Sequence, residues 1–161
     1  MKKLMLSALV FATAFIACQS DYQKEIEERK AKKKAEIEEE SKVPASERIT
    51  LDNKGVGPIK NIELTAEIDE EMVQRGMELF KTNCTACHKV DKRFIGPSPK
   101  GIMKRRSPEW IMNMILDPQL MVEQDRCAKD LLVEFNGAAM ANQNMTEEQA
   151  RDILEYFRTL E

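Results

Sequence analysis

The stretch KTNCTACHKV, residues 81–90, places Cys84 and Cys87 three positions apart, and His88 follows directly. His88 is the only histidine among the 161 residues. Two thiols one helical turn apart beside an imidazole can belong to a zinc site, a redox dithiol, a structural disulfide or a haem attachment site. The rest of the sequence has to distinguish among these four kinds of site.

Zinc takes four ligands, and beyond this motif the domain offers only Cys127, at an unfamiliar spacing. A dithiol of the thioredoxin type needs strands that alternate with helices, and no such pattern is present. Haem attachment explains the spacing chemically, because each thiol can add to one vinyl group while the imidazole lies under the iron. The sequence therefore predicts one covalent haem c, attached through Cys84 and Cys87, with His88 as an iron ligand.

The N-terminus carries an export signal. Two lysines precede an apolar run over residues 4–17, which is shorter than the roughly 17–25 residues of a membrane span. The small residues Ala12–Ala14 suit an ordinary signal peptidase, whereas FIAC, residues 15–18, resembles a lipobox with Cys18 as the lipidated residue. The position of Cys18 at the end of the run favours the lipoprotein. We therefore expect the protein to be lipid-anchored on the periplasmic side of a bacterial membrane.

The composition divides the chain into four segments. Residues 1–17 are assigned to the signal peptide, and residues 18–48 to a charged stalk, helical or disordered, with too few apolar side chains to fold alone. Residues 49–64 contain turn signals and form an extended lead-in. From about residue 65 to 161 helical patterns recur without a convincing strand. This predicts a small all-α domain around the haem.

Helix boundaries in this domain can be predicted from capping residues. Asp69, Ser107 and Thr146 are suitable N-caps, and Thr146 begins the capping box TEEQ. A further helix is expected over residues 119–137, and the glycine at its end should close it. The domain should therefore contain four or five short helices.

Three segments resemble class I c-type cytochromes, and the resemblance covers about residues 65–161. GMELFKTNCTACH, residues 76–88, resembles the first helix and haem motif of that family. IGPSPKGI, residues 95–102, resembles the Gly-Pro loop that follows. MANQNMTEEQARDILEYF, residues 140–157, resembles the segment with the second iron ligand and the last helix. The resemblance implies a cytochrome c fold, in which Gly76 and Phe80 lie where the first helix crosses the last.

The resemblance also implies roles for single residues at the iron. Pro97 would offer its carbonyl to the ring N–H of His88, and such contacts orient a ligating imidazole. The chain has no second histidine to act as the sixth ligand. The resemblance implies Met140 instead, with Met145 as the apolar residue before the last helix. Ligation by Met145 and an open iron position remain the alternatives.

The formal net charge of −3 does not indicate a nucleic-acid partner. No carboxylate pair or Ser-His pair suggests an enzyme. The resemblance implies a membrane-tethered mono-haem carrier of single electrons between a respiratory-chain donor and a terminal reductase or oxidase. The alternatives are a haem-based sensor or ligand-binding module with a displaceable axial methionine, and a lipoprotein spacer without haem.

Basic side chains are concentrated directly after the haem motif. Between residues 89 and 106 they are opposed only by Asp91, and they comprise Lys89, Lys92, Arg93, Lys100, Lys104, Arg105 and Arg106. Because screening limits such forces to about 8 Å at physiological salt, this patch would act mainly on a partner close to the haem. We expect membrane-associated redox partners that are acidic at their docking face.

Overall fold

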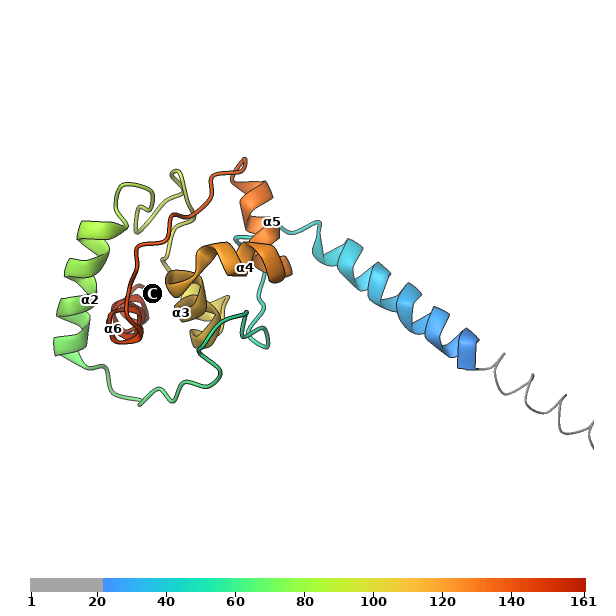
Figure 1. Ribbon diagram of the computed structural model, residues 1–161, viewed down its shortest axis with the longest axis horizontal. Helices are drawn as coiled ribbons and strands as arrows, with labels where there is room; N and C mark the ends of the chain where they lie inside the picture. The colour runs from blue at the N-terminus through green and yellow to red at the C-terminus, as the bar shows by residue number, and fades with distance from the viewer. Residues whose placement is uncertain (1–21) are drawn as a thin grey trace, which may run out of the picture. The chain divides into compact units, whose positions relative to one another are not determined.

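The computed structural model describes residues 22–161, so the proposed signal peptide and Cys18 lie outside the described residues. The chain divides into two units, residues 1–43 and residues 44–161 (Figure 1). The described part of the first unit is a helix over residues 22–40, followed by a turn. Ion pairs one helical turn apart, such as Glu25–Arg29 at 2.7 Å, run along this helix. No helix in residues 22–161 is both long and apolar enough to cross a bilayer.

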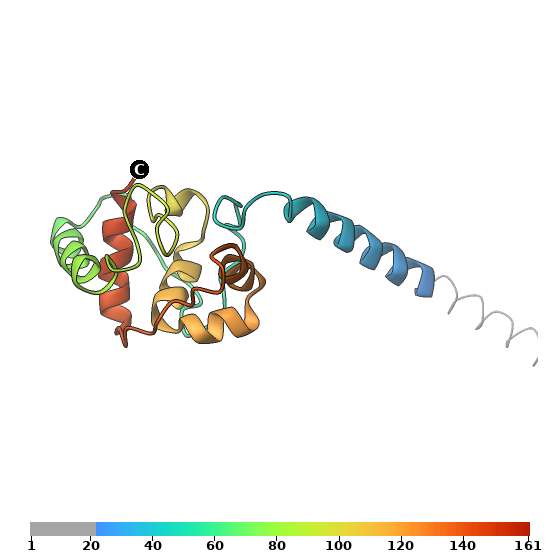
Figure 2. The ribbon, with the colours of Figure 1, turned by 90° about the horizontal axis from the view of Figure 1, so that it is seen from above.

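The second unit is all-α, and residues 22–161 contain no strand beyond one isolated bridge between Thr50 and Arg106. Its first helix, α2 (Glu70–Asn83), begins where the Asp69 side chain accepts from Met72 N–H. Its last helix, α6 (Glu147–Arg158), begins with the expected capping box. The two helices lie side by side (Figures 1 and 2).

Gly76 sets how closely α2 and α6 approach. A Cβ on Gly76 would lie 2.0 Å from the carbonyl oxygen of Asp152, so only glycine fits this crossing. One turn later, the Phe80 ring packs against Tyr156 and Phe157, with ring centroids 5.7 Å from each. The crossing therefore lies at the residues that the resemblance implied.

The middle of the domain contains the 3₁₀ helix η1 (Ile102–Lys104) and three short α-helices. Helix α3 (Pro108–Leu116) is capped by Ser107, with proline in its first turn. The single helix expected over residues 119–137 is wrong, because the structure has α4 (Pro118–Gln124) and α5 (Arg126–Glu134). The chain becomes extended at Asp125, whose carboxylate caps α5 through Ala128 N–H and accepts from the Trp110 indole at 3.0 Å.

Residues 44–53, which we call the strap, pack on the helical domain. The Ser46 hydroxyl donates to Glu134 at 2.6 Å, and Thr50 N–H donates to the Arg105 carbonyl at 2.8 Å. Farther along, the Asn53 carbonyl accepts from the Ser107 hydroxyl. The compact unit therefore begins at Pro44, and it includes the residues that composition alone assigned to the end of the stalk and to the lead-in.

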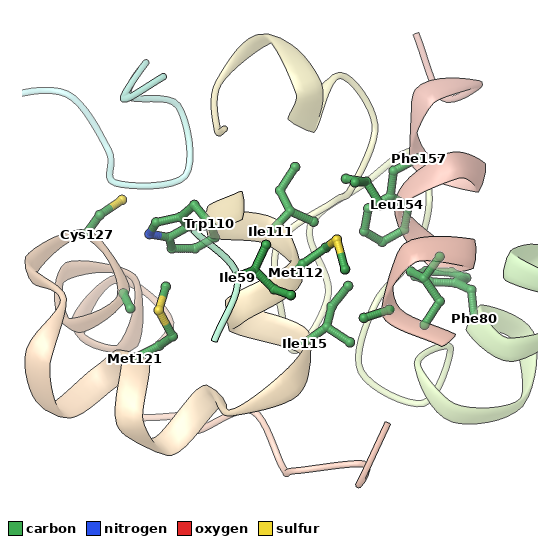
Figure 3. Packing of buried hydrophobic residues seen from close by; sticks show 13 residues of the cluster. Ile59, Phe80, Trp110, Ile111, Met112, Ile115, Met121, Cys127, Leu154 and Phe157 are labelled. Carbon is green, nitrogen blue, oxygen red and sulfur yellow. The ribbon is translucent and has the colours of Figure 1, made fainter. Parts of the chain in front are cut away.

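The apolar core extends across α3 between two flanking groups of side chains (Figure 3). Phe80, Leu154 and Phe157 lie on one side of Ile111 and Ile115, whereas Trp110, Met121 and Cys127 gather on the other (Figure 3). Ile111 and Leu154 are almost fully buried. This core supports one wall of the cavity described next.

Candidate haem site

The haem motif forms a tight turn at the end of α2. The N–H of Cys84 still donates to the Phe80 carbonyl, and the Cys84 carbonyl then accepts from Cys87 at 3.0 Å and from His88 at 2.8 Å. This turn brings both thiols and the imidazole to the same cavity. Cys84 is partly buried and Cys87 is exposed, so the motif lies at the rim of the cavity.

The loop after the motif holds the imidazole. The Pro97 carbonyl oxygen lies 2.8 Å from Nδ1 of His88, which leaves the other ring nitrogen, Nε2, for a metal. Gly96 N–H donates to the Cys87 carbonyl at 2.8 Å. A Cβ on Gly96 would lie 2.5 Å from Cε1 of His88, so glycine is needed for this loop to close on the ring.

Met140 lies in the loop between α5 and α6 and lines the same cavity as His88. Two bends with positive φ flank it, at Asn136 and Gly137 on one side and at Asn144 on the other. Met145 and Met114 also line the cavity, and both pack against the core. The helical pattern of the sequence suggests a core position for Met114, and only the folded chain shows that it lines the cavity.

Apolar side chains form most of the cavity wall, as a porphyrin requires. The charged residues that line it are basic, Arg105 and Arg106, and no aspartate or glutamate of residues 22–161 lines it. Burial, together with the charge of Arg106, lowers the pKa of Arg105. Burial also raises the pKa of the Cys84 thiol to about 11, so this thiol is uncharged at neutral pH. The residues present therefore fit a haem attached through the sulfurs of Cys84 and Cys87.

Three separate segments meet at Glu134, at the end of α5. Its carboxylate accepts from the Ser46 amide at 2.8 Å, and from Arg93 at 2.9 Å. Arg93 also stacks over the Phe135 ring at 4.0 Å. Ser46 and Phe135 line the cavity. Glu134 thus joins the strap, the loop after the haem motif and α5 at the edge of the cavity.

Sequence reasoning missed Arg105, Arg106 and Ser46 as cavity residues. The run RRSPEW combines two arginines with a helix cap, but no local signal shows that both arginines line a cavity. Cys127 is 6% exposed among apolar neighbours, as a small buried hydrophobe. Residues 22–161 contain no cluster of three or more His, Cys, Asp or Glu side chains that could hold a metal ion.

An all-α domain with a C-x-x-C-H turn at the rim of an apolar cavity defines a haem-attaching protein. The family model described as "Cytochrome c" matches residues 73–161, and the chain belongs to that family. It follows that the protein is a c-type cytochrome with covalently attached haem c, and that its domain is that of an electron carrier rather than an enzyme.

Solved structures agree with this assignment. A cytochrome c from Rhodothermus marinus shares 41% identity and a TM-score of 0.63, covering 73% of this chain and 93% of that one. An engineered cytochrome c from the same organism shares 40% identity and a TM-score of 0.63, over 74% and 96% of the two chains. The same engineered protein bound to a carbene intermediate gives 40% identity and a TM-score of 0.60, over the same shares. No curated protein matches the chain.

Proposed function

We propose that this c-type cytochrome is tethered to a bacterial membrane and carries single electrons between a respiratory-chain donor and a terminal reductase or oxidase. One observation carries the electron-transfer part: His88 and Met140 line the same cavity as the two attachment cysteines. With both side chains on the iron, no position is left for a substrate. The bound haem supplies a one-electron couple, and Met–His ligation favours a raised potential.

The tether is inferred from the N-terminal segments. The apolar run ends at Cys18, and the helix over residues 22–40 is charged and exposed along almost its whole length. A helix of this length extends about 30 Å. A tether of this kind raises the effective concentration of the haem domain near membrane partners.

Three basic side chains of the proposed docking patch are already engaged within the protein. Arg106 is buried, Arg93 is paired with Glu134, and Lys104 is paired with Glu161. Lys89, Lys92 and Lys100 form no ion pair with a described residue, although the Lys89 ammonium donates to the Thr85 carbonyl at 2.8 Å. Phe94, whose ring centroid lies 5.1 Å from the Lys89 ammonium, is 49% exposed. A partner with acidic groups around a small apolar centre would suit this surface.

Replacing Cys18 tests the tether. Cys18→Ala should remove lipid attachment and move the haem protein from the membrane fraction to the soluble exported fraction. The measurements are incorporation of labelled fatty acid and cell fractionation. Cys127→Ala is the matched control, because this buried cysteine should leave the protein on the membrane. An unaltered protein that never takes up fatty acid would show that cleavage occurs near Ala14 instead.

A haem-based sensor is the alternative function, and the loop that holds Met140 is the observation in its favour. Residues 138–146 form neither helix nor strand, and an irregular loop can open locally more readily than a helix packed in the core. Binding of carbon monoxide to the reduced unaltered protein would favour this alternative.

A further inference from the structure

The loop that carries Met140 is fixed at its ends more than along its length. Residues 139–145 form neither helix nor strand and run from α5 to α6 (Figures 1 and 2). The two hydrogen bonds that these residues make within the described chain are both internal, and the longer, from the Gln143 amide to the Ala141 carbonyl, measures 3.2 Å. The position of Met140 therefore depends on how the ends of the loop are held.

The start of the loop is held by Arg93, from the segment that follows the haem motif. The Arg93 guanidinium donates to the Glu134 carboxylate at 2.9 Å and to the Glu134 carbonyl at 2.7 Å, and its carbon lies 4.0 Å from the centroid of the Phe135 ring. Phe135 is buried and lines the cavity. Arg93 thus binds both side chain and main chain at the point where α5 ends and the Met140 loop begins.

The strap holds the same carboxylate. The amide and the hydroxyl of Ser46 donate to the two carboxylate oxygens of Glu134, at 2.8 and 2.6 Å. The Glu134 side chain is only 16% exposed, so these charge-assisted hydrogen bonds are partly shielded from water. We call Ser46, Arg93 and Glu134 the clasp. Its strap member precedes residues 73–161, the segment that matches the family model, so the clasp is not contained in that segment.

We propose that Glu134 is a positioning residue for Met140, and that the clasp sets how readily this methionine leaves the iron. The inference rests on the proposed function, in which Met140 is the sixth ligand. The closed clasp ties the start of the loop to the strap and to the segment that also orients His88. Once the clasp is broken, the loop can swing away as one piece, because its own hydrogen bonds do not attach it to the rest of the described chain.

Cyanide binding to the oxidised, haem-loaded full chain measures how readily the methionine leaves. At saturating cyanide the departure of Met140 limits the rate, because both ligands compete for one iron position. Glu134→Gln keeps the size of the side chain and removes its charge. It should raise the limiting rate about tenfold, the effect expected when charge-assisted hydrogen bonds are weakened. Loss of the weak red absorption band of methionine-bound oxidised haem follows the same event.

Asp130→Asn is the matched control. Asp130 lies one helical turn earlier on α5, and its carboxylate pairs with Arg48 of the strap and with Arg126 of its own helix, neither of which belongs to the clasp. The two variants therefore make the same chemical change on the same helix, and both weaken a contact with the strap. Asp130→Asn should leave the limiting rate within about twofold of that of the unaltered protein. Denaturant unfolding of both variants measures any difference in stability.

Arg93→Gln tests whether the clasp acts as a unit. Arg93→Gln combined with Glu134→Gln should raise the limiting rate no more than the larger single effect, because both changes break the same contact. If Glu134→Gln does not fold, Ser46→Ala replaces it, since this change removes one hydroxyl and keeps the ion pair. Ser46→Ala should raise the limiting rate about threefold, and an unchanged rate in Ser46→Ala would contradict the proposal.

Two further results would overturn the proposal. One is a limiting rate in Glu134→Gln equal to that of the unaltered protein. The other is an equal increase in Glu134→Gln and Asp130→Asn, which would mean that any loosening of the strap has the same effect. Failure of the proposed function gives a different result, because the unaltered protein would then lack the red band and bind cyanide without a limiting rate.

Discussion

At the scale of single residues, Met140 and Met145 differ in their surroundings although both line the cavity. Met145 packs against the core directly before α6, whereas Met140 lies in a loop between residues with positive φ. Met140→Ala should therefore remove the axial thioether, lower the reduction potential by on the order of 0.1–0.3 V, and open the iron to carbon monoxide. Redox titration and the spectrum of the reduced protein under carbon monoxide are the measurements.

Met145→Leu is the control for this prediction, because it keeps an apolar side chain of similar volume. It should leave both the potential and the spectrum close to those of the unaltered protein. The opposite pattern, with Met145→Leu opening the iron, would assign the ligand to Met145.

At the scale of helices, the close crossing of α2 and α6 depends on Gly76, which has no side chain. In an exposed helix Gly→Ala is stabilising, but a Cβ at Gly76 would meet the Asp152 carbonyl at 2.0 Å. Gly76→Ala should therefore lower the free energy of unfolding by about 3 kcal/mol, the upper part of the range for overpacking. Denaturant unfolding of the haem-loaded protein measures this, with Gln74→Ala on the exposed face of α2 as control. Equal or greater stability in Gly76→Ala would contradict the close crossing.

The carboxylate of Glu155 on α6 makes the domain sensitive to acid. Burial opposes ionisation of this group, but the Asp69 N–H and the guanidinium groups of Arg151 and Arg158 outweigh burial and lower its pKa. Because the pKa of Glu155 is lower in the folded protein than in the unfolded chain, the ionised carboxylate stabilises the fold above pH 4.5, the ordinary pKa of glutamate. This stabilisation is lost as the pH falls through the pKa that Glu155 has in the folded protein. The free energy of unfolding should therefore fall below about pH 4.5, with a smaller slope in Glu155→Gln. Glu148→Gln, at an exposed position of α6, should keep the slope, and identical slopes in all three proteins would rule out Glu155 as the cause.

Helix boundaries were predictable where one residue supplies the cap. Asp69, Ser107 and Thr146 each accept from the backbone N–H three residues later, a local arrangement that the sequence order already contains. The break at Asp125 was not predictable, because its carboxylate also accepts from Trp110 and Asn53, residues that only the fold brings near. For the same reason the contiguous haem motif was predictable but the place of Arg106 was not, because its two acceptors in the strap lie 58 and 61 positions away.

At the scale of the whole molecule, the distribution of charge should govern encounters with partners. Replacing Lys89, Lys92 and Lys100 together by glutamine should slow association with an acidic partner by about tenfold at low salt and flatten its salt dependence. The spectrum should not change, because none of the three lines the cavity. Stopped-flow electron transfer at several ionic strengths is the measurement.

A control of equal charge replaces three lysines in the exposed helix over residues 22–40, namely Lys24, Lys30 and Lys33. If both triple substitutions slow association equally, the association rate depends on the net charge of the protein and not on the surface beside the haem motif.

The position of Glu134 has a consequence for how the protein is assembled. Its partner Ser46 lies 88 positions earlier in the chain and Arg93 lies 41 positions earlier. Closing loops of this length costs more chain entropy than forming a helix, so we expect these contacts to form after α2 and the turn of the haem motif. During that interval we expect the thiols to be accessible, because the edge of the cavity is still open. The time available for attaching the cofactor then depends on how slowly the last of these long-range contacts forms. No part of the folded domain has to open to admit the cofactor.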